Sequence, residues 1–214
     1  MDSFTFFNNH LDYIVILDHL GTFAFAVSGI RLAYLDRLDW FGAYVVGLVT
    51  AIGGGTTRDV LLDTTPFWME QPSYLIITGL ALITVLLFES IIQKMSKTLY
   101  IFDAIGLGLF TVVGIEKALV FDFPWWVAIL MGMITGAIGG VIRDVLLNET
   151  PLIFRKDVYA MACILGGVVF FISDEIGMLH SFSGILAATT VIVVRIIALQ
   201  YHIEIPIFKP RKEL

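Results

Sequence analysis

Charged residues are scarce in this sequence, and apolar residues are abundant. Asp, Glu, Lys and Arg make up only 15% of the 214 residues, whereas soluble domains carry about a quarter. Apolar residues make up 58%, and the mean hydropathy is +0.90. A domain of this size could not keep so much apolar surface away from water. The composition therefore excludes an ordinary soluble domain and predicts that lipid surrounds most of the chain.

Cysteines, basic stripes and catalytic motifs are also missing. Cys163 is the one cysteine and lies in an apolar stretch, which excludes a disulfide framework and a thiolate metal cluster. The net charge of −6 and the lack of a basic stripe argue against a nucleic-acid partner. The sequence contains no HExxH or HxxxH spacing, no Gly-x-Ser-x-Gly and no phosphate loop. We therefore expect no enzymatic activity, no cofactor and no structural metal site.

Seven apolar stretches are long enough to cross a membrane as helices. A spanning helix needs about 20 apolar residues to cross about 30 Å of hydrocarbon. The predicted stretches are 12–34, 41–62, 73–92, 100–120, 125–147, 158–175 and 181–200. The sequence thus predicts an all-α membrane protein with a single membrane domain over residues 1–214, embedded in membrane lipids, and a cytoplasmic tail over 201–214.

Lysine and arginine alternate between successive predicted loops. They occur after the first, third and fifth stretches and in the tail, but not before the first stretch or after the second and sixth. Near the end of the fourth stretch, Lys117 is balanced by Glu116 and Asp122. Because basic loops stay in the cytoplasm, we expect an inner-membrane protein with its N-terminus outside and its C-terminus cytoplasmic. The segment before the first stretch has no Lys or Arg, so we expect no signal peptide and a retained N-terminus.

The sequence repeats itself at an offset of 85 residues, with residues 18–74 aligned to 103–159 without a gap. The strongest block reads Gly-Gly-x-x-Arg-Asp-Val-Leu-Leu-x-x-Thr-Pro, and it begins at Gly54 and again at Gly139. Paired glycines, Arg-Asp and Thr-Pro at one fixed offset are not expected by chance in apolar sequence. We therefore interpret the match as a structural repeat.

Each copy of the repeat contains three predicted stretches. We predict one three-helix unit over 12–92, a second over 98–175, and a seventh helix over 181–200. Because three is an odd number, the second copy is inverted in the membrane. Many transport proteins have this construction, with the substrate path between the copies. A duplicated structural bundle without a path is the alternative.

Glycines gather in the second and fifth predicted helices. Gly53, Gly54 and Gly55 are consecutive, and Gly139 and Gly140 occupy the equivalent place in the second copy. Each glycine costs about 0.5–1 kcal/mol relative to alanine in a helix. We therefore expect a kink or an unwound turn in both helices, beside a path. The alternative is close packing of helices through small residues.

Charged residues follow these glycines at a depth where lipid does not tolerate charge. By depth, Arg58 is expected to pair with Asp18 in the outer half of the membrane, and Arg143 with Asp103 in the inner half. The residues predicted to line the path are the charged Asp18, Arg58, Asp59, Asp103, Arg143 and Asp144, and the polar Ser28, Thr56 and Thr135. Two aspartates in opposite halves of the membrane do not form the shared-proton pair of a protease.

Simpler interpretations exist for the same residues. Each arginine could extend to a nearby surface, the Arg-Asp pairs could be caps or interfacial charges, and each threonine could bond to its own helix. Glu116 and Lys117 could be a surface pair or part of an outer vestibule. Arg195, near the cytoplasmic end of the last stretch, is expected to extend to the surface.

Together, the block from Gly53 to Asp59, its echo from Gly139 to Asp144, and the seven stretches resemble a known family. The chain is similar to prokaryotic trimeric intracellular cation (TRIC) channels, which overlap bacterial proteins with a glycine-transporter domain. The resemblance covers residues 12 to 200. It implies a homotrimer with an ion path in each subunit, lined by glycine-kinked second and fifth helices. It also implies that Arg58, Asp59, Arg143 and Asp144 lie near that path.

Two features of the sequence depart from the family pattern. Ile138 stands where the first copy has its first glycine, and Glu116-Lys117 reverses the Lys-Glu order that binds lipid in the animal channels. Because of the reversed order, we do not extend the phosphoinositide binding of the animal channels to this chain. We expect a passive channel for K⁺ or Na⁺, mainly potassium. The alternatives are a carrier for a small zwitterion such as glycine and a membrane scaffold without transport.

Overall fold

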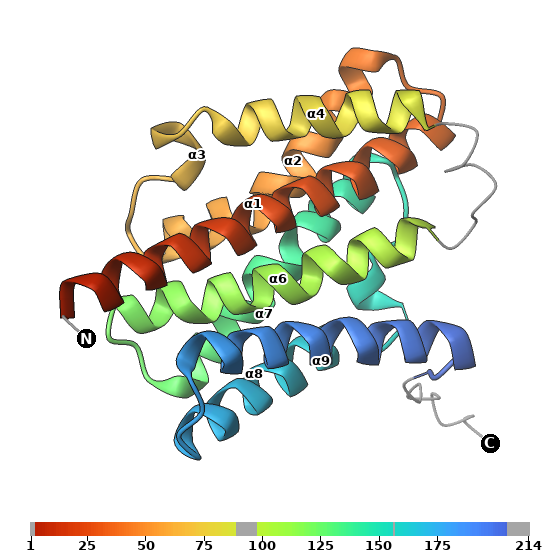
Figure 1. The fold of residues 1–214 in the computed structure, drawn as a ribbon. Helices are drawn as coiled ribbons and strands as arrows, with labels where there is room; N and C mark the ends of the chain where they lie inside the picture. The colour runs from red at the N-terminus through yellow and green to blue at the C-terminus, as the bar shows by residue number, and fades with distance from the viewer. Residues whose placement is uncertain (1–2, 89–97, 156, 205–214) are drawn as a thin grey trace, which may run out of the picture.

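A computed structural model of the chain describes residues 3–88, 98–155 and 157–204. Helices make up most of these ranges (Figure 1). The elements are α1 (Ser3–Leu35), α2 (Trp40–Leu61), α3 (Phe67–Glu70), α4 (Ser73–Leu87), α6 (Thr98–Val120), α7 (Trp125–Leu146), the 3-10 helix η1 (Leu152–Phe154), α8 (Ala160–Glu175) and α9 (His180–Tyr201). The described part of the chain is therefore all-helical, apart from an isolated bridge between Asp157 and Glu204.

A helix lies at each of the seven stretches predicted from the sequence. The first helix begins at Ser3 rather than at residue 12. Residues 89–92 of the third stretch, and most of the predicted tail, lie outside the described residues. Among the described helices, three have the length and hydropathy of a membrane span by composition alone. These are Tyr13–Leu35, Trp125–Leu146 and His180–Tyr201.

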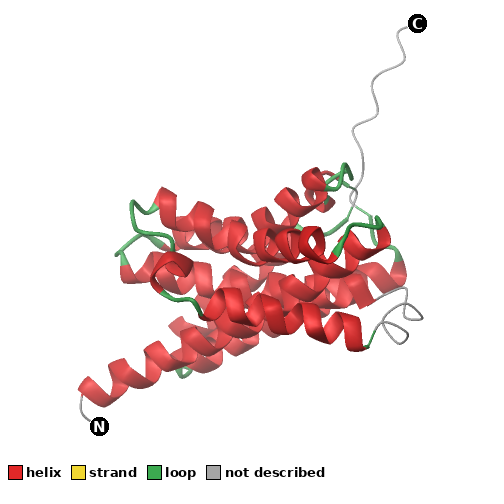
Figure 2. Ribbon diagram, turned by 90° about the horizontal axis from the view of Figure 1, so that it is seen from above, coloured by secondary structure: helices red, strands yellow, loops and turns green. Residues whose placement is uncertain are grey.

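Four helices form the centre of the molecule. α1, α2, α6 and α7 make the most extensive contacts, and each packs on two of the others. α4 packs against α1 and α2 on one side, whereas α8 and α9 pack against α7 and α6 on the other (Figure 1). Figure 2 shows that the start of α1 extends beyond the other helices. The core therefore lies between the helices that the sequence repeat relates to one another.

The chain turns in the same way at positions 85 residues apart. Arg37 and Asp122 have positive φ angles of 62° and 56°, and Asp63 and Asn148 both have φ angles of 54°. Asp and Asn tolerate this left-handed conformation because their short polar side chains bond locally. The correspondence seen in the sequence thus extends to the turns that follow α1, α2, α6 and α7.

The contact between α1 and α6 repeats the same correspondence. The rings of Phe25 and Phe110 meet edge to face with centroids 5.1 Å apart, and both residues are buried. A Cβ atom at Gly106 would collide with the ring of Phe25, and one at Gly21 would press on the ring of Phe110. Each glycine therefore makes room for the aromatic ring of the other helix.

The glycine-rich segments of α2 and α7 are helical without interruption. α2 continues across residues 53–55, and α7 continues across residues 139–140. The predicted unwound turn is therefore wrong. A bend of the helix axis at these glycines stays a prediction.

Close packing explains why glycine occupies these positions. A Cβ atom at Gly54 would collide with the carbonyl oxygen of Thr135 in α7, and one at Gly139 would collide with the carbonyl oxygen of Thr50 in α2. The two collisions are equivalent at the offset of 85 residues. The backbones of α2 and α7 thus touch where no side chain fits, which is the small-residue packing of membrane helices.

Gly54→Ala is expected to lower stability, because the colliding atom is a backbone carbonyl that cannot rotate away. Overpacking of this kind costs about 1–3 kcal/mol. Gly79→Ala in α4 is the matched control, since a Cβ atom there meets nothing within 4 Å and alanine favours the helix. The measurement is the midpoint of thermal unfolding of the purified protein in detergent. Equal midpoints for the two variants would contradict the contact between α2 and α7.

Candidate functional site

All the charged residues predicted to line a path are buried. The exposed fraction is 7% for Asp18 and 2% or less for the others. Arg58 and Arg143 are each 1% exposed, so the interpretation that they extend to a surface is wrong. We name two clusters after these arginines. The Arg143 cluster contains Arg143, Asp103, Asp144 and Ser28, and the Arg58 cluster contains Arg58, Asp59, Asp18, Tyr74 and Lys117.

The Arg143 cluster joins three helices through one guanidinium group. Arg143 Nη1 lies 2.6 Å from Asp103 Oδ1 on α6 and donates to Ser28 Oγ on α1 at 2.8 Å. Its Nε atom donates to Asp144 Oδ1 at 2.8 Å. The predicted pair between Arg143 and Asp103 is thus confirmed. Charge-assisted bonds of this kind are stronger than neutral ones, so α1, α6 and α7 are tied together here.

The Arg58 cluster is arranged differently. Arg58 Nε donates to Asp59 Oδ1 at 2.8 Å, and Lys117 Nζ from α6 lies 2.9 Å from the same oxygen. Asp18 Oδ2 instead accepts a hydrogen bond from the Tyr74 hydroxyl at 2.6 Å. Among the described contacts, no ion pair joins Asp18 to Arg58. The predicted pair is therefore wrong in this half, where Tyr74 binds one oxygen of the Asp18 carboxylate.

The second oxygen of each Asp that follows an arginine holds the next loop. Asp59 Oδ2 accepts from the backbone N–H of Phe67 at 2.9 Å, and Asp144 Oδ2 accepts from that of Leu152 at 3.1 Å. Each aspartate therefore orients its arginine with one oxygen and anchors the chain after the Thr-Pro pair with the other. The repeated Thr-Pro was the sequence signal for this anchor.

Lys117 distinguishes the two clusters. The position 85 residues earlier is Leu32, so the Arg143 cluster has no equivalent lysine. Beside that cluster lies a cavity of about 210 Å³ that reaches Arg143. It is lined by Leu32, Tyr100, Arg143, Asp144, Glu149, Leu152 and Arg155. The ammonium group of Lys117 pairs with the buried Asp59, and its place in an outer vestibule stays a prediction.

The predicted polar residues behave in two ways. Ser28 reaches the Arg143 cluster. The hydroxyls of Thr56 and Thr135 donate to carbonyl oxygens one turn back in their own helices, Ile52 at 2.7 Å and Met131 at 2.7 Å. The threonine hydroxyls thus satisfy local backbone acceptors, and a role for them beside a path stays a prediction.

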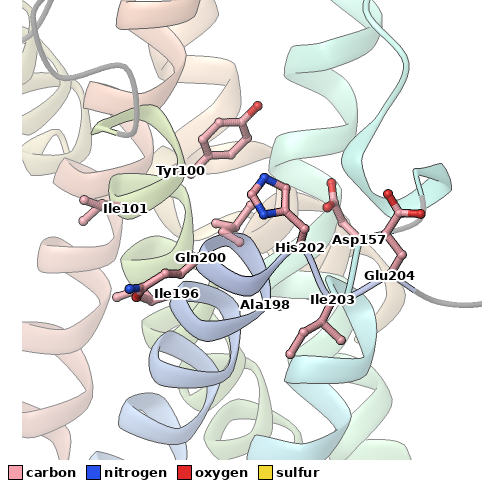
Figure 3. A pocket seen from close by; sticks show the side chains of 10 residues that line it. Tyr100, Ile101, Asp157, Ile196, Ala198, Gln200, His202, Ile203 and Glu204 are labelled. Atoms are coloured by element: carbon pink, nitrogen blue, oxygen red, sulfur yellow. The ribbon is translucent and has the colours of Figure 1, made fainter.

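A larger cavity of about 350 Å³ lies away from both clusters. Figure 3 shows it between Tyr100 and Ile101 at the start of α6 and Gln200, His202 and Ile203 at the end of α9. None of the residues of the Arg58 or Arg143 clusters lines it. This cavity therefore belongs to the end of the bundle and not to the contact between α2 and α7.

Arg195 corrects another expectation from the sequence. It is 0% exposed, and its Nη1 atom donates to the carbonyl oxygen of Val158 at 3.2 Å. Its guanidinium carbon lies 4.8 Å from the centre of the Tyr159 ring.

Sequence reasoning also missed Tyr74 and Tyr159. A signal for both existed, because this pair of tyrosines ends the aligned ranges of the repeat.

Comparisons with known proteins agree on one group of membrane proteins. The family model described as "Glycine transporter" matches residues 15–90 and again 100–175. The chain is 40% identical to a UPF0126 membrane protein of Vibrio cholerae over 210 residues, which cover 97% of this chain and 87% of that one. It is 38% identical to the UPF0126 inner membrane protein YadS of Escherichia coli K12 over 200 residues, which cover 90% and 94%.

A solved structure shares the fold. The TRIC trimeric intracellular cation channel orthologue from Rhodobacter sphaeroides superposes with a TM-score of 0.83 and 34% identity. The match covers 89% of this chain and 98% of that one.

Asp103→Asn is expected to destabilise the protein more than Asp18→Asn. The amide oxygen in Asp103→Asn can still accept from Arg143, but the change removes one of the two negative charges that face the buried guanidinium, and weakening of a buried charge-assisted bond costs about 1.5–3 kcal/mol. The amide oxygen in Asp18→Asn still accepts from Tyr74, so a loss of about 1 kcal/mol or less is expected. Thermal unfolding midpoints in detergent measure both. Equal losses would contradict the different pairing of the two aspartates.

Proposed function

Because the chain belongs to the prokaryotic TRIC channel family, which overlaps the glycine-transporter family, we propose that it is a passive channel for monovalent cations, chiefly potassium. The path runs within each subunit, between α2 and α7. Seven helices span the membrane as two inverted three-helix copies plus α9. The loop charges support an orientation with the Arg58 cluster toward the outside and the Arg143 cluster toward the cytoplasm.

The observation that carries this proposal is the pair of buried clusters on α2 and α7. The arginine of each cluster follows the glycines at which α2 and α7 pack closely, and a cavity reaches Arg143. Buried charge in a membrane protein is costly and commonly marks an ion or substrate route. A purely structural duplication would not require charged residues at these positions.

The structure fits a closed state of such a channel. The helix backbones touch at the glycines, and an arginine in the path raises an electrostatic barrier to cations. Lys117 adds a second positive charge on the side of Asp59. Conduction then requires the positively charged groups of Arg58, Arg143 and Lys117 to move away from the route. The aspartates of the two clusters remain to attract cations, namely Asp18, Asp59, Asp103 and Asp144.

The solved relative supports the assembly and the ion class. It is a trimeric cation channel orthologue by its description and shares about a third of its residues with this chain. We therefore propose a homotrimer with one path in each subunit.

A glycine carrier is the second candidate, favoured by the description of the family model. Carriers of this kind use broken helices, whose half-helix ends bind the carboxylate and the amine of the substrate. α2 and α7 are continuous, so the ends that such a site needs are missing from these two helices. This observation favours the channel.

Potassium flux through the purified protein in liposomes tests the proposal. We expect flux that does not saturate in the millimolar range, measured against protein-free liposomes and with valinomycin as the positive control. Uptake of labelled glycine is measured in parallel. Saturable glycine uptake, competed by unlabelled glycine and without potassium flux, would replace the channel by a carrier.

A further inference from the structure

Tyr74 and Tyr159 occupy equivalent positions in the two copies, as do Asp18 and Asp103. Each aspartate therefore has the same two candidate partners, a tyrosine hydroxyl and the arginine of its cluster. Tyr74 comes from α4, and Tyr159 immediately precedes α8. The two halves thus bring together the same three types of side chain from corresponding elements.

In the Arg58 half, Asp18 is bound to the tyrosine and not to the arginine. The Tyr74 hydroxyl donates to Asp18 Oδ2 at 2.6 Å. Arg58 Nη1 is buried and has no hydrogen-bond partner among the described residues. The guanidinium carbon of Arg58 lies 5.6 Å from the centre of the Phe67 ring. With Asp18 bound to Tyr74, Arg58 keeps Asp59 and is released from Asp18.

In the Arg143 half, Asp103 is bound to the arginine and not to the tyrosine. Asp103 Oδ1 lies 2.6 Å from Arg143 Nη1. Asp103 Oδ2 and the Tyr159 hydroxyl are both buried without a hydrogen-bond partner in the described part of the chain. The equivalents of these two atoms bond to each other in the other half. The aspartate is therefore bound to the tyrosine in one half and to the arginine in the other.

The Tyr159 hydroxyl and the Arg143 cluster border the same small space. A Cβ atom placed on Gly140 would lie 2.9 Å from the Tyr159 hydroxyl, 3.6 Å from Arg143 Nη2 and 3.7 Å from Asp103 Oδ1. All three groups thus surround one small space that glycine keeps free. A short movement of the Tyr159 ring or of Asp103 would make the bond seen in the other half.

Arg195 lies beside Tyr159 in only one of the two halves. It lies on α9, which has no equivalent in the repeat, and its guanidinium group faces the Tyr159 ring at 4.8 Å. A cation over an aromatic face holds the ring in place. Tyr74 has other aromatic neighbours, with centroids of Phe67 at 4.4 Å and His19 at 5.1 Å.

We propose that Tyr74 and Tyr159 are positioning residues that compete with Arg58 and Arg143 for Asp18 and Asp103, and that Arg195 holds Tyr159 away from Asp103. A hydrogen bond from the Tyr159 hydroxyl to the unoccupied Asp103 Oδ2 stabilises the carboxylate and weakens its hold on Arg143, which stays at Oδ1 in this structure. The weaker tie between α6 and α7 then lets the arginine leave the route. This inference rests on the proposed cation conduction, and it adds the side chains that decide when the arginines move.

Tyr159→Phe tests the exchange, because it removes the competing hydroxyl and leaves Asp103 with Arg143. Single-channel recordings in planar bilayers are expected to show an open probability about tenfold lower, the factor that one hydrogen bond to a charged group supplies. The unfolding midpoint is expected to stay unchanged, because the lost hydroxyl has no hydrogen-bond partner among the described residues. A merely structural tyrosine would not separate these two readouts.

Tyr44→Phe is the matched control, since the Tyr44 hydroxyl donates to the exposed carbonyl of Leu75, and its open probability is expected to equal that of the wild type. Arg195→Met is expected to raise the open probability, and to have no such effect in a Tyr159→Phe background. A wild-type open probability in Tyr159→Phe would overturn the proposal, whether or not the arginine variant folds.

The absence of any wild-type potassium current would reject the proposed function instead, and stability then decides on the partners. Tyr74→Phe is expected to lower the unfolding midpoint and Tyr159→Phe to leave it unchanged. Equal effects of these two variants would overturn the opposite pairing of the two halves.

Discussion

An arginine enclosed by membrane helices needs an anion beside it, because an uncompensated charge is strongly destabilising there. Arg58 and Arg143 meet this requirement with the residue that follows each of them, Asp59 and Asp144. The other oxygen of each aspartate holds the loop that leads to the next helix. The aspartates that neutralise the arginines of α2 and α7 therefore also hold the loops that lead to α4 and α8.

Much of the fold could be predicted because its signals are local or periodic. Hydropathy alone places a helix at each predicted stretch, and the offset of 85 residues anticipates the equivalent turns after α2 and α7. The pair between Arg143 and Asp103 could be predicted from depth, since helices that enter and leave a membrane bring their residues to comparable levels. This reasoning needs no knowledge of the side chains on other helices.

The remaining features depend on neighbours that a single segment does not specify. Glycine weakens a helix in isolation, but Gly54 lies against the carbonyl of Thr135, so tertiary contact keeps the helix intact. Asp18 and Arg58 lie in the predicted elements, but the Tyr74 hydroxyl from α4 takes the carboxylate. Competition among three side chains from different helices cannot be resolved by depth alone.

The central claim is that the buried arginines control the passage of cations, and single-channel recording of Arg58→Ala and Arg143→Ala tests it most directly. Arg37→Ala, which removes a positive charge from an exposed turn, is the control. Loss of a buried positive charge lowers the barrier to cations, so both cluster variants should show altered conductance or gating while the control matches the wild type. Unchanged currents in both cluster variants would contradict the account.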